Sequence, residues 1–413
     1  EASAVPPSIK RFGCMTSVPW LTLIGMDAGG FASLSAEACA AVRAASVIMA
    51  PPRHLSGLPK LPAQKVKWPT PFNAGLDDLL ARRGSPVTVL VSGDPFWFGA
   101  GTQIVRHLDR SEWCALPGRS CFSLAASALG WAIDSSSAFG LHAAPFSRLR
   151  PHLCPGRRCL VTVRDGAAVS ALAAYLAETG FGESQLTVLE SLGSSDQIIT
   201  TLRADDSISN VFHHPLMIGI DVAGSGQTLP QASGLSDDWF EHDGQITKAP
   251  VRALTLSALA PRPGQNLWDL GAGSGSVSIE WLLSGPAMQA TAVEQHPDRA
   301  ARIQANATRL GVDWLQLVQK DNLAALDGLA RPDAVFVGGG LRDQLLDRLW
   351  QTIPAGTRLV ANAVTIETDR LLTSAHERLG GQLIRLELSQ LQTIGRMAGW
   401  QAGYPITQWA VIR

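Results

Sequence analysis

The chain has 413 residues, too many for one ordinary hydrophobic core, so we expect two domains. Its 34 basic and 35 acidic residues nearly cancel and no long basic run occurs, which argues against a nucleic-acid partner. No apolar run reaches the length of a membrane span, and the first residues lack a signal-peptide core, so we expect a cytoplasmic protein without a membrane partner. The 6 cysteines lack metal-ligand spacing, and we expect no metal site.

Hydrophobic patterning divides the chain at residues 224–238, which are rich in Gly, Ser, Gln and Asp and are typical of a linker. Before it, residues 18–223 alternate short apolar strands with alanine-rich helices, as α/β domains do. There we expect strands at 20–25, 87–91, 159–163 and 216–222 and helices at 36–45 and 168–178. Residues 1–17 precede this pattern, and we interpret them as an extension.

Residues 239–413 predict a second α/β domain with a doubly wound parallel sheet. Its expected elements are a helix at 251–260 and strands at 266–270, 290–294, 334–337 and 357–361. Residues 383–389 and 405–411 could form an antiparallel hairpin that closes the sheet.

A glycine-rich turn follows the strand at 266–270, which carries Asp269 just before the turn. The turn consists of Gly271, Ala272, Gly273, Ser274 and Gly275. Its glycines let backbone approach a ligand, the next helix turns its N–H groups toward that ligand, and Glu294 at the end of the second strand could hold a ribose. Dinucleotide-binding folds and S-adenosylmethionine (SAM) methyltransferases share this spacing. Ser276 stands where a dinucleotide turn needs Gly or Ala, which favours SAM over a nicotinamide cofactor.

Several polar or glycine-rich segments are expected at the same sheet edge. Thr247 and Lys248 could reach the cofactor, although the spacing alone favours an ordinary capping segment with a solvated lysine. Asp321 and Asn322 follow the apolar residues 315–318, which we expect to form a third strand between those at 290–294 and 334–337, and they could hold an adenine or form a surface turn. Gly338 opens a run of three glycines after the fourth strand, and such a platform admits a large flat substrate.

Asn362 and Glu367 follow the fifth strand and are expected to line the substrate mouth. Capping of a helix by Thr365 and Thr368 is the alternative interpretation of this segment.

In the first domain, a strand runs directly into Gly93 and Asp94, and aromatic residues follow at once. This loop resembles the cofactor loop of the tetrapyrrole methylases, and the resemblance implies that Gly93, Asp94, Phe96, Gly99 and Ser123 contact the cofactor. It also makes His142 a candidate for catalysis, with a packed or surface histidine as the alternative. The resemblance implies a substrate rich in carboxylates, for which the candidates are Arg53, Arg119, Arg342 and Arg396, although each alone is more typical of a solvated surface residue.

The motifs of the second domain, in their order, resemble the decarboxylating precorrin methyltransferases of cobalamin biosynthesis. They are Asp243-Gly-Gln-Ile-Thr-Lys248, the turn at 271–275, Val337-Gly-Gly-Gly340 and Asn362-Ala-Val-Thr-Ile-Glu-Thr368. The loop at 93–99, with 117–126 and 188–193, is similar to the tetrapyrrole methylases. One departure is Gly25-Met-Asp27-Ala-Gly29-Gly30, where that family opens Gly-x-Gly-x-Asp-Gly.

The resemblance implies a two-lobed tetrapyrrole methylase domain followed by a class I, Rossmann-like SAM methyltransferase domain, a fusion typical of precorrin-6Y C5,15-methyltransferases. It implies SAM as cofactor and precorrin-6Y as the tetrapyrrole substrate, with C5 methylation in the first domain and C15 methylation and decarboxylation in the second. Within it, Lys248, Asn362, Glu367 and His142 are the catalytic candidates, and a homo-oligomer is possible. A two-domain NAD-dependent oxidoreductase and a non-catalytic SAM-binding protein are the alternatives.

Overall fold

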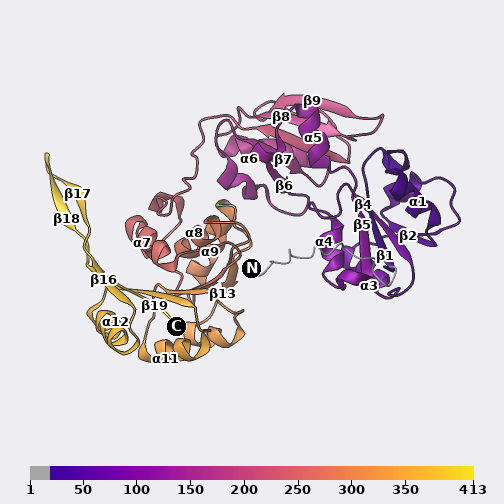
Figure 1. The fold of residues 1–413 in the computed structure, drawn as a ribbon. Helices are drawn as coiled ribbons and strands as arrows, with labels where there is room; N and C mark the ends of the chain where they lie inside the picture. Colours follow the sequence, from indigo (N-terminus) through magenta and orange to yellow (C-terminus); the bar gives the residue numbers. More distant parts are fainter. Residues whose placement is uncertain (1–18) are drawn as a thin grey trace, which may run out of the picture. The chain divides into compact units, whose positions relative to one another are not determined.

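The computed structural model describes residues 19–413, so the expected extension at 1–17 lies outside the described residues. The chain forms two compact units (Figure 1). The described part of the first contains residues 19–144 and 155–226, and the second contains 145–154 and 227–413. The patterning did not anticipate that 145–154, which carry the 3-10 helix Phe146–His152, pack with the second unit. No helix of the described chain is long and apolar enough to cross a bilayer.

The first sheet of the first unit is parallel throughout, in the order β3-β2-β4-β1-β5. Its strands are β1 (Leu21–Met26), β2 (Val47–Ala50), β3 (Gln64–Lys67), β4 (Val87–Ser92) and β5 (Trp113–Leu116). The helices α1 (Ala36–Ala44), α2 (Pro52–Ser56), α3 (Phe72–Leu80) and α4 (Ala100–Val105) alternate with these strands. Because the strands are parallel, the loops that follow them meet at one edge of the sheet.

The second sheet of this unit has the order β6-β7-β10-β8-β9 and is mostly antiparallel. Its strands are β6 (Ser137–Gly140), β7 (Arg158–Thr162), β8 (Gln185–Glu190), β9 (Ile198–Arg203) and β10 (Leu216–Asp221). The helices α5 (Cys121–Leu129) and α6 (Ala167–Glu178) accompany it. The two sheets confirm the two-lobed architecture that the resemblance implied.

The second unit is built on a seven-stranded sheet with the order β13-β12-β11-β14-β15-β19-β16. Its strands are β11 (Asn266–Leu270), β12 (Gln289–Val293), β13 (Gln316–Val318), β14 (Ala334–Val337), β15 (Arg358–Ala363), β16 (Gln382–Leu386) and β19 (Ile406–Ile412). The helices are α7 (Ala249–Leu259), α8 (Ser276–Leu283), α9 (Pro297–Arg309), α10 (Asn322–Ala325), α11 (Asp343–Thr352) and α12 (Ile366–Leu379). Strand order reverses between β11 and β14, and ligands bind at such a switch point in open α/β sheets.

The expected closing hairpin is confirmed, because β16 and β19 pair antiparallel and β19 also pairs antiparallel with β15. The chain between them forms a further two-stranded hairpin, β17 (Ser389–Ile394) with β18 (Met397–Ala402), that the patterning did not predict. Figure 1 shows this hairpin extending beyond the seven-stranded sheet.

A buried ion pair anchors the end of the expected linker to the second unit. Arg252 on α7 is fully buried, and its Nε donates to Glu280 Oε1 on α8 at 2.5 Å. Glu280 also accepts hydrogen bonds from the backbone N–H groups of Gly234 (2.6 Å) and Leu235 (3.0 Å). The Leu235 side chain lies in the same core as α7 and α8, so this stretch is partly an element of the unit.

We predict that Arg252→Met destabilises the second unit by about 3 to 5 kcal/mol, because Glu280 would remain buried without its cation. The matched control is Arg348→Met, which removes an exposed pair with Asp327 and should cost less than about 1 kcal/mol. Urea unfolding of the full chain measures both. Equal losses in the two variants would contradict the prediction.

Candidate functional site

The glycine turn after β11 has the backbone conformation that its sequence predicts. Gly271, Gly273 and Gly275 have φ angles of 70°, 61° and 75°, in the left-handed region that favours glycine. A Cβ on Gly271 would lie 2.6 Å from the carbonyl oxygen of Gly339, so the turn and the glycine run after β14 touch through backbone alone. Helix α8 then begins at Ser276.

Two buried carboxylates flank this turn. Asp269 Oδ2 accepts from the N–H (3.1 Å) and the hydroxyl (2.6 Å) of Ser278, whereas its buried Oδ1 has no hydrogen-bond partner in the described part of the chain. Glu294 accepts from the backbone N–H of Gly273 (3.0 Å) and of His296 (2.9 Å). Asp269 and Glu294, predicted from their spacing, therefore meet at the ends of β11 and β12.

Burial raises the pKa of Asp269 to about 6, because the desolvated carboxylate outweighs the stabilising hydrogen bonds from Ser278, and the charge of Glu294 raises it further. The hydroxyl of Ser274, also buried, lacks a partner as well. Unpartnered Asp269 Oδ1 and Ser274 Oγ, beside glycines that leave room for a ligand, fit a cofactor with hydroxyl and amine donors.

The segment before α7 lies on the turn. A Cβ on Gly273 would come within 3.3 Å of the carbonyl oxygen of Gln245. Thr247 follows, and its carbonyl accepts a hydrogen bond from Arg252. The exposed Lys248 forms an ion pair with Asp237, Nζ to Oδ2 at 3.3 Å. The structure thus gives Lys248 an acidic partner that the motif did not indicate.

Asn322 and Gly338 belong to the same surroundings, whereas Asp321 has a capping role. Asn322 Nδ2 donates to the carbonyl of Gly339 at 3.0 Å. Asp321 accepts from the backbone N–H of Leu323 (2.9 Å) and caps α10, so the turn interpretation accounts for its side chain. A Cβ on Gly338 would lie 2.9 Å from the ring of Phe336, which explains a glycine there.

Asn362, near the end of β15, is held by two residues that sequence reasoning missed. Its Nδ2 donates to Thr255 Oγ1 (2.9 Å), and its Oδ1 accepts from Gln408 Nε2 (2.9 Å), which also contacts Thr255 (3.1 Å). Gln408 is 2% exposed. The available signal was a glutamine within a strand, β19, whose residues after it are all apolar.

Glu367 lies exposed in the first turn of α12 and forms no hydrogen bond or ion pair in the described chain. Thr365 caps that helix by accepting from the N–H of Thr368 at 3.3 Å, so the capping alternative for Thr365 is confirmed.

In the first unit, loops far apart in sequence meet through glycines. A Cβ on Gly25 would lie 1.9 Å from the carbonyl oxygen of Gly93 and 2.3 Å from the nitrogen of Gly118. Gly93 has a φ of 63°, and Asp94 folds the next residues by accepting from the N–H of Phe96 at 2.7 Å. Gly99 is the N-cap residue of α4. The predicted cofactor loop therefore meets the end of β1 and the loop after β5.

This loop carries three consecutive aromatic residues, Phe96, Trp97 and Phe98. Trp97 and Phe98 lie against Phe122 of α5, with ring centroids 5.6 and 5.3 Å apart, and Ser123 follows on the exposed side of that helix. Phe98 has a φ of 52°, a strained conformation for a bulky residue. Phe96, Trp97 and Phe98 are 43%, 39% and 53% exposed, which offers apolar surface beside the loop.

Two other residues of the first unit have contrasting surroundings. Asp27 accepts from Gly29 N–H (2.8 Å) and pairs with Arg119 (2.7 Å), so its charge is already balanced. His142 is exposed and forms no hydrogen bond or ion pair within the described residues, so nothing orients its ring.

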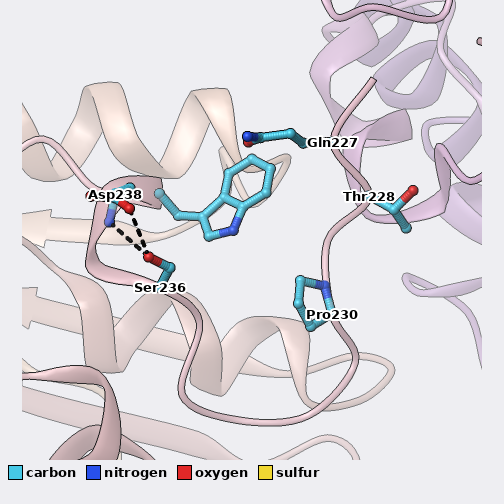
Figure 2. Close-up of a pocket in the computed structure, with 6 residues that line it drawn as sticks. Gln227, Thr228, Pro230, Ser236 and Asp238 are labelled. Carbon is cyan, nitrogen blue, oxygen red and sulfur yellow. Dashed lines mark hydrogen bonds between the residues drawn. The ribbon is translucent and has the colours of Figure 1, made fainter. Parts of the chain in front are cut away.

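Figure 2 shows a separate open pocket at the linker, where Ser236 Oγ accepts from the N–H of Asp238. It is lined by Gln227, Thr228, Pro230, Ser236, Asp238 and Trp239. None of the predicted site residues lines it, and we assign it no part in the cofactor sites.

The raised pKa of Asp269 predicts a pH-dependent stability. The folded chain binds this proton more tightly than the unfolded chain, so the contribution is fully present below the usual value of 3.8 and is lost as the pH rises through about 6. The shift corresponds to roughly 3 kcal/mol. Asp269→Asn should lack this loss, so urea unfolding of both proteins between about pH 4 and 7 should show wild type declining relative to the variant. A difference that stays constant with pH would contradict the prediction.

Comparison with known proteins gives matches to both units. Residues 21–206 match a family model described as "Tetrapyrrole (Corrin/Porphyrin) Methylases", and residues 238–413 match one described as "Precorrin methyltransferase domain". The C-terminal domain of precorrin-6Y C5,15-methyltransferase from Rhodobacter capsulatus, a solved structure, is 50% identical, with 45% of this chain and 100% of that chain covered and a TM-score of 0.44.

Two curated relatives differ in how much of the chain they match. Cobalt-precorrin-6B C(15)-methyltransferase (decarboxylating) of Salmonella typhimurium is 33% identical over 36% of this chain and 80% of its own length. Precorrin-6Y C(5,15)-methyltransferase [decarboxylating] of Sinorhizobium sp. is 46% identical over 95% of this chain and 96% of its own length. The chain thus belongs to the family of decarboxylating precorrin-6Y C5,15-methyltransferases.

Proposed function

We propose that this chain methylates precorrin-6Y at C5 and C15 with SAM and removes the carboxyl group of the ring C acetate, giving precorrin-8X in cobalamin biosynthesis. The observation that carries the proposal is that each unit has a cradle, a place where glycines leave backbone alone to face a ligand. These cradles are the turn at 271–275 with the glycine run after β14, and the contact of Gly25, Gly93 and Gly118. Each lies in a unit that matches a methylase family model. The same proposal includes a cytoplasmic location, a tetrapyrrole as the binding partner and a possible homo-oligomer.

In the second unit, the turn at 271–275 would surround the cofactor, with Glu294 accepting from its ribose. Asp269 Oδ1 and Ser274 Oγ are the unsatisfied groups available to it, and Thr247, Asn322 and Gly338 lie on segments that meet this turn or the glycine run beside it. In the first unit, Gly93, Asp94, Phe96, Gly99 and Ser123 would line the corresponding cradle. SAM supplies the methyl group on a sulfonium.

The chain's main contribution to methyl transfer would be alignment and exclusion of water, since the reduced macrocycle provides its own nucleophilic carbon. Asn362 suits this task because Thr255 and Gln408 fix its amide in one orientation. We propose that Asn362, Glu367 and Lys248 influence substrate protonation during decarboxylation in the second unit, and that His142 acts in the first. The bound macrocycle can accept the electron pair that the departing carbon dioxide leaves.

We assign C5 methylation to the first unit and C15 methylation with decarboxylation to the second. The Salmonella typhimurium relative supports this division, because its name contains only the C15 and decarboxylation steps and it matches a share of this chain that one unit could supply.

Substituting one glycine in each cradle should separate the activities. Gly271→Val should abolish C15 methylation and decarboxylation, because its Cβ would collide with the Gly339 carbonyl, and should leave C5 methylation intact. Gly93→Val should have the converse effect, because the strain of a valine at a φ of 63° would shift the loop whose backbone packs against Gly25 and Gly118. Mass spectrometry of the tetrapyrrole products distinguishes methylation from loss of carbon dioxide.

Gly264→Val and Gly84→Val are matched controls, since both glycines have positive φ angles and open space around the position of a Cβ. They should retain both activities. A chain that binds SAM at both cradles but never alkylates precorrin-6Y would instead be a non-catalytic SAM-binding protein.

The polar cluster beneath Asn362 gives a further prediction. Gln408→Leu should lower the rate of the C15 reaction by roughly 10-fold while SAM affinity stays unchanged, because Asn362 loses the partner that fixes its amide. Calorimetry and product analysis measure the two quantities. A parallel loss of SAM affinity would show that Gln408 only maintains the fold of the second unit.

A further inference from the structure

A cluster at the carboxyl edge of the first sheet contains a guanidinium that has no acidic partner among residues 19–413. Arg53 lies in α2, directly after β2, and its Nη2 donates to the hydroxyl of Ser92, the last residue of β4. Its Nη1 lies 3.2 Å from Nδ1 of His214, which precedes β10 of the second sheet. The cluster thus joins both sheets of this unit beside Gly93.

The hydrogen bonds of the cluster define its charge. A guanidinium only donates, so His214 Nδ1 must accept and that imidazole is neutral while the contact holds. Ser92 accepts from Arg53 and can donate to Nε2 of the buried His54, which lies 3.1 Å away. Burial lowers the pKa of His54 to about 4, so this ring is neutral at physiological pH as well. The cluster therefore carries one positive charge, that of Arg53.

No carboxylate of the described chain lies within ion-pair distance of Arg53. The acids that act electrostatically on the two neighbouring histidines are already paired, Asp27 with Arg119 (2.7 Å) and Asp165 with Arg164 (3.0 Å). The Arg53 side chain is exposed, and so are the hydrogen bonds of both its Nη atoms, which leaves the guanidinium within reach of a ligand. An exposed cation whose nearest partners are neutral can bind an anion without breaking an existing ion pair.

We propose that Arg53, positioned by Ser92 and His214, binds a carboxylate side chain of the tetrapyrrole during methylation in the first unit. The inference rests on the proposed function for the nature of the ligand. Ser92 and His214 occupy only part of the guanidinium's donors, and the remaining N–H groups can receive a carboxylate in the paired geometry that arginine favours. His214 has a positioning role, because it holds the fork without touching the reacting carbon.

The test compares Arg53→Gln with wild type in the full chain, using precorrin-6Y and SAM with an isotopically labelled methyl group, so that methylation at C5 and at C15 is followed separately by NMR. We expect the KM for precorrin-6Y in C5 methylation to rise roughly 10- to 100-fold. The Kd for SAM and the C15 reaction should stay unchanged. Arg53→Lys, which keeps the charge but not the fork, should fall between wild type and Arg53→Gln.

Arg43→Gln is the charge-matched control, since Arg43 is an exposed arginine in the last turn of α1 that lies over Phe31, and this variant should behave as wild type. Weaker SAM binding in Arg53→Gln would mean that the carboxylate belongs to the methionine part of the cofactor, which overturns the proposal. An unchanged KM in an active enzyme overturns it too. A wild-type chain that leaves precorrin-6Y unmethylated overturns the proposed function and this inference together.

Discussion

The close approach of backbone to backbone at the ends of parallel strands is the constraint on which both sites depend. In the first unit the chain at Gly25, Gly93 and Gly118 comes so near that a single Cβ would stand 1.9 Å from a carbonyl oxygen. In the second unit Gly271 and Gly339 meet in the same way. Side chains have no room at these contacts, so N–H and C=O groups form the surface that a ligand meets. In both sheets, therefore, backbone without side chains lines the edge at which the parallel strands end.

Around these contacts, the polar side chains of the second unit fall into satisfied and unsatisfied sets. The Arg252 and Glu280 pair and the Asn362, Thr255 and Gln408 cluster satisfy one another and fix the helices and strands that carry them. Asp269 Oδ1 and Ser274 Oγ are buried and have no hydrogen-bond partner among the described residues. Unsatisfied buried groups destabilise a fold, and these two lie beside the glycine turn, where a ligand would complete them.

The sequence predicts the features that depend on short stretches of residues, such as buried strands, glycine turns and the spacing of motif residues. The strands at 266–270 and 334–337 have the predicted bounds, since both are buried on both faces and end in a glycine-rich turn, although Asn266 and Asp269 interrupt the apolar run of the first. Asp269, Glu294 and the glycines between them followed from spacing. The partners of Lys248 and Asn362 could not be predicted in this way, because Asp237 and Gln408 are brought to them by tertiary packing. The β17 and β18 hairpin was missed because its exposed strands alternate weakly in hydrophobicity.

The site of the first unit likewise depends on contacts between residues far apart in sequence, so the sequence predicts less of it than of the second site. Its cradle combines the end of β1 with the loops after β4 and β5. Its unpaired cation, Arg53, contacts His214, which is 161 positions away in the chain and belongs to the other sheet's surroundings. A motif within a short stretch of sequence cannot predict such a long-range contact. Arg53 differs from Arg119, which also lies beside Gly93, because Arg119 pairs with Asp27 whereas Arg53 has no acidic partner among the described residues. An unpaired charged side chain is recognised only when the positions of the surrounding acidic residues are known. Its sign then indicates the charge of the ligand that it would bind.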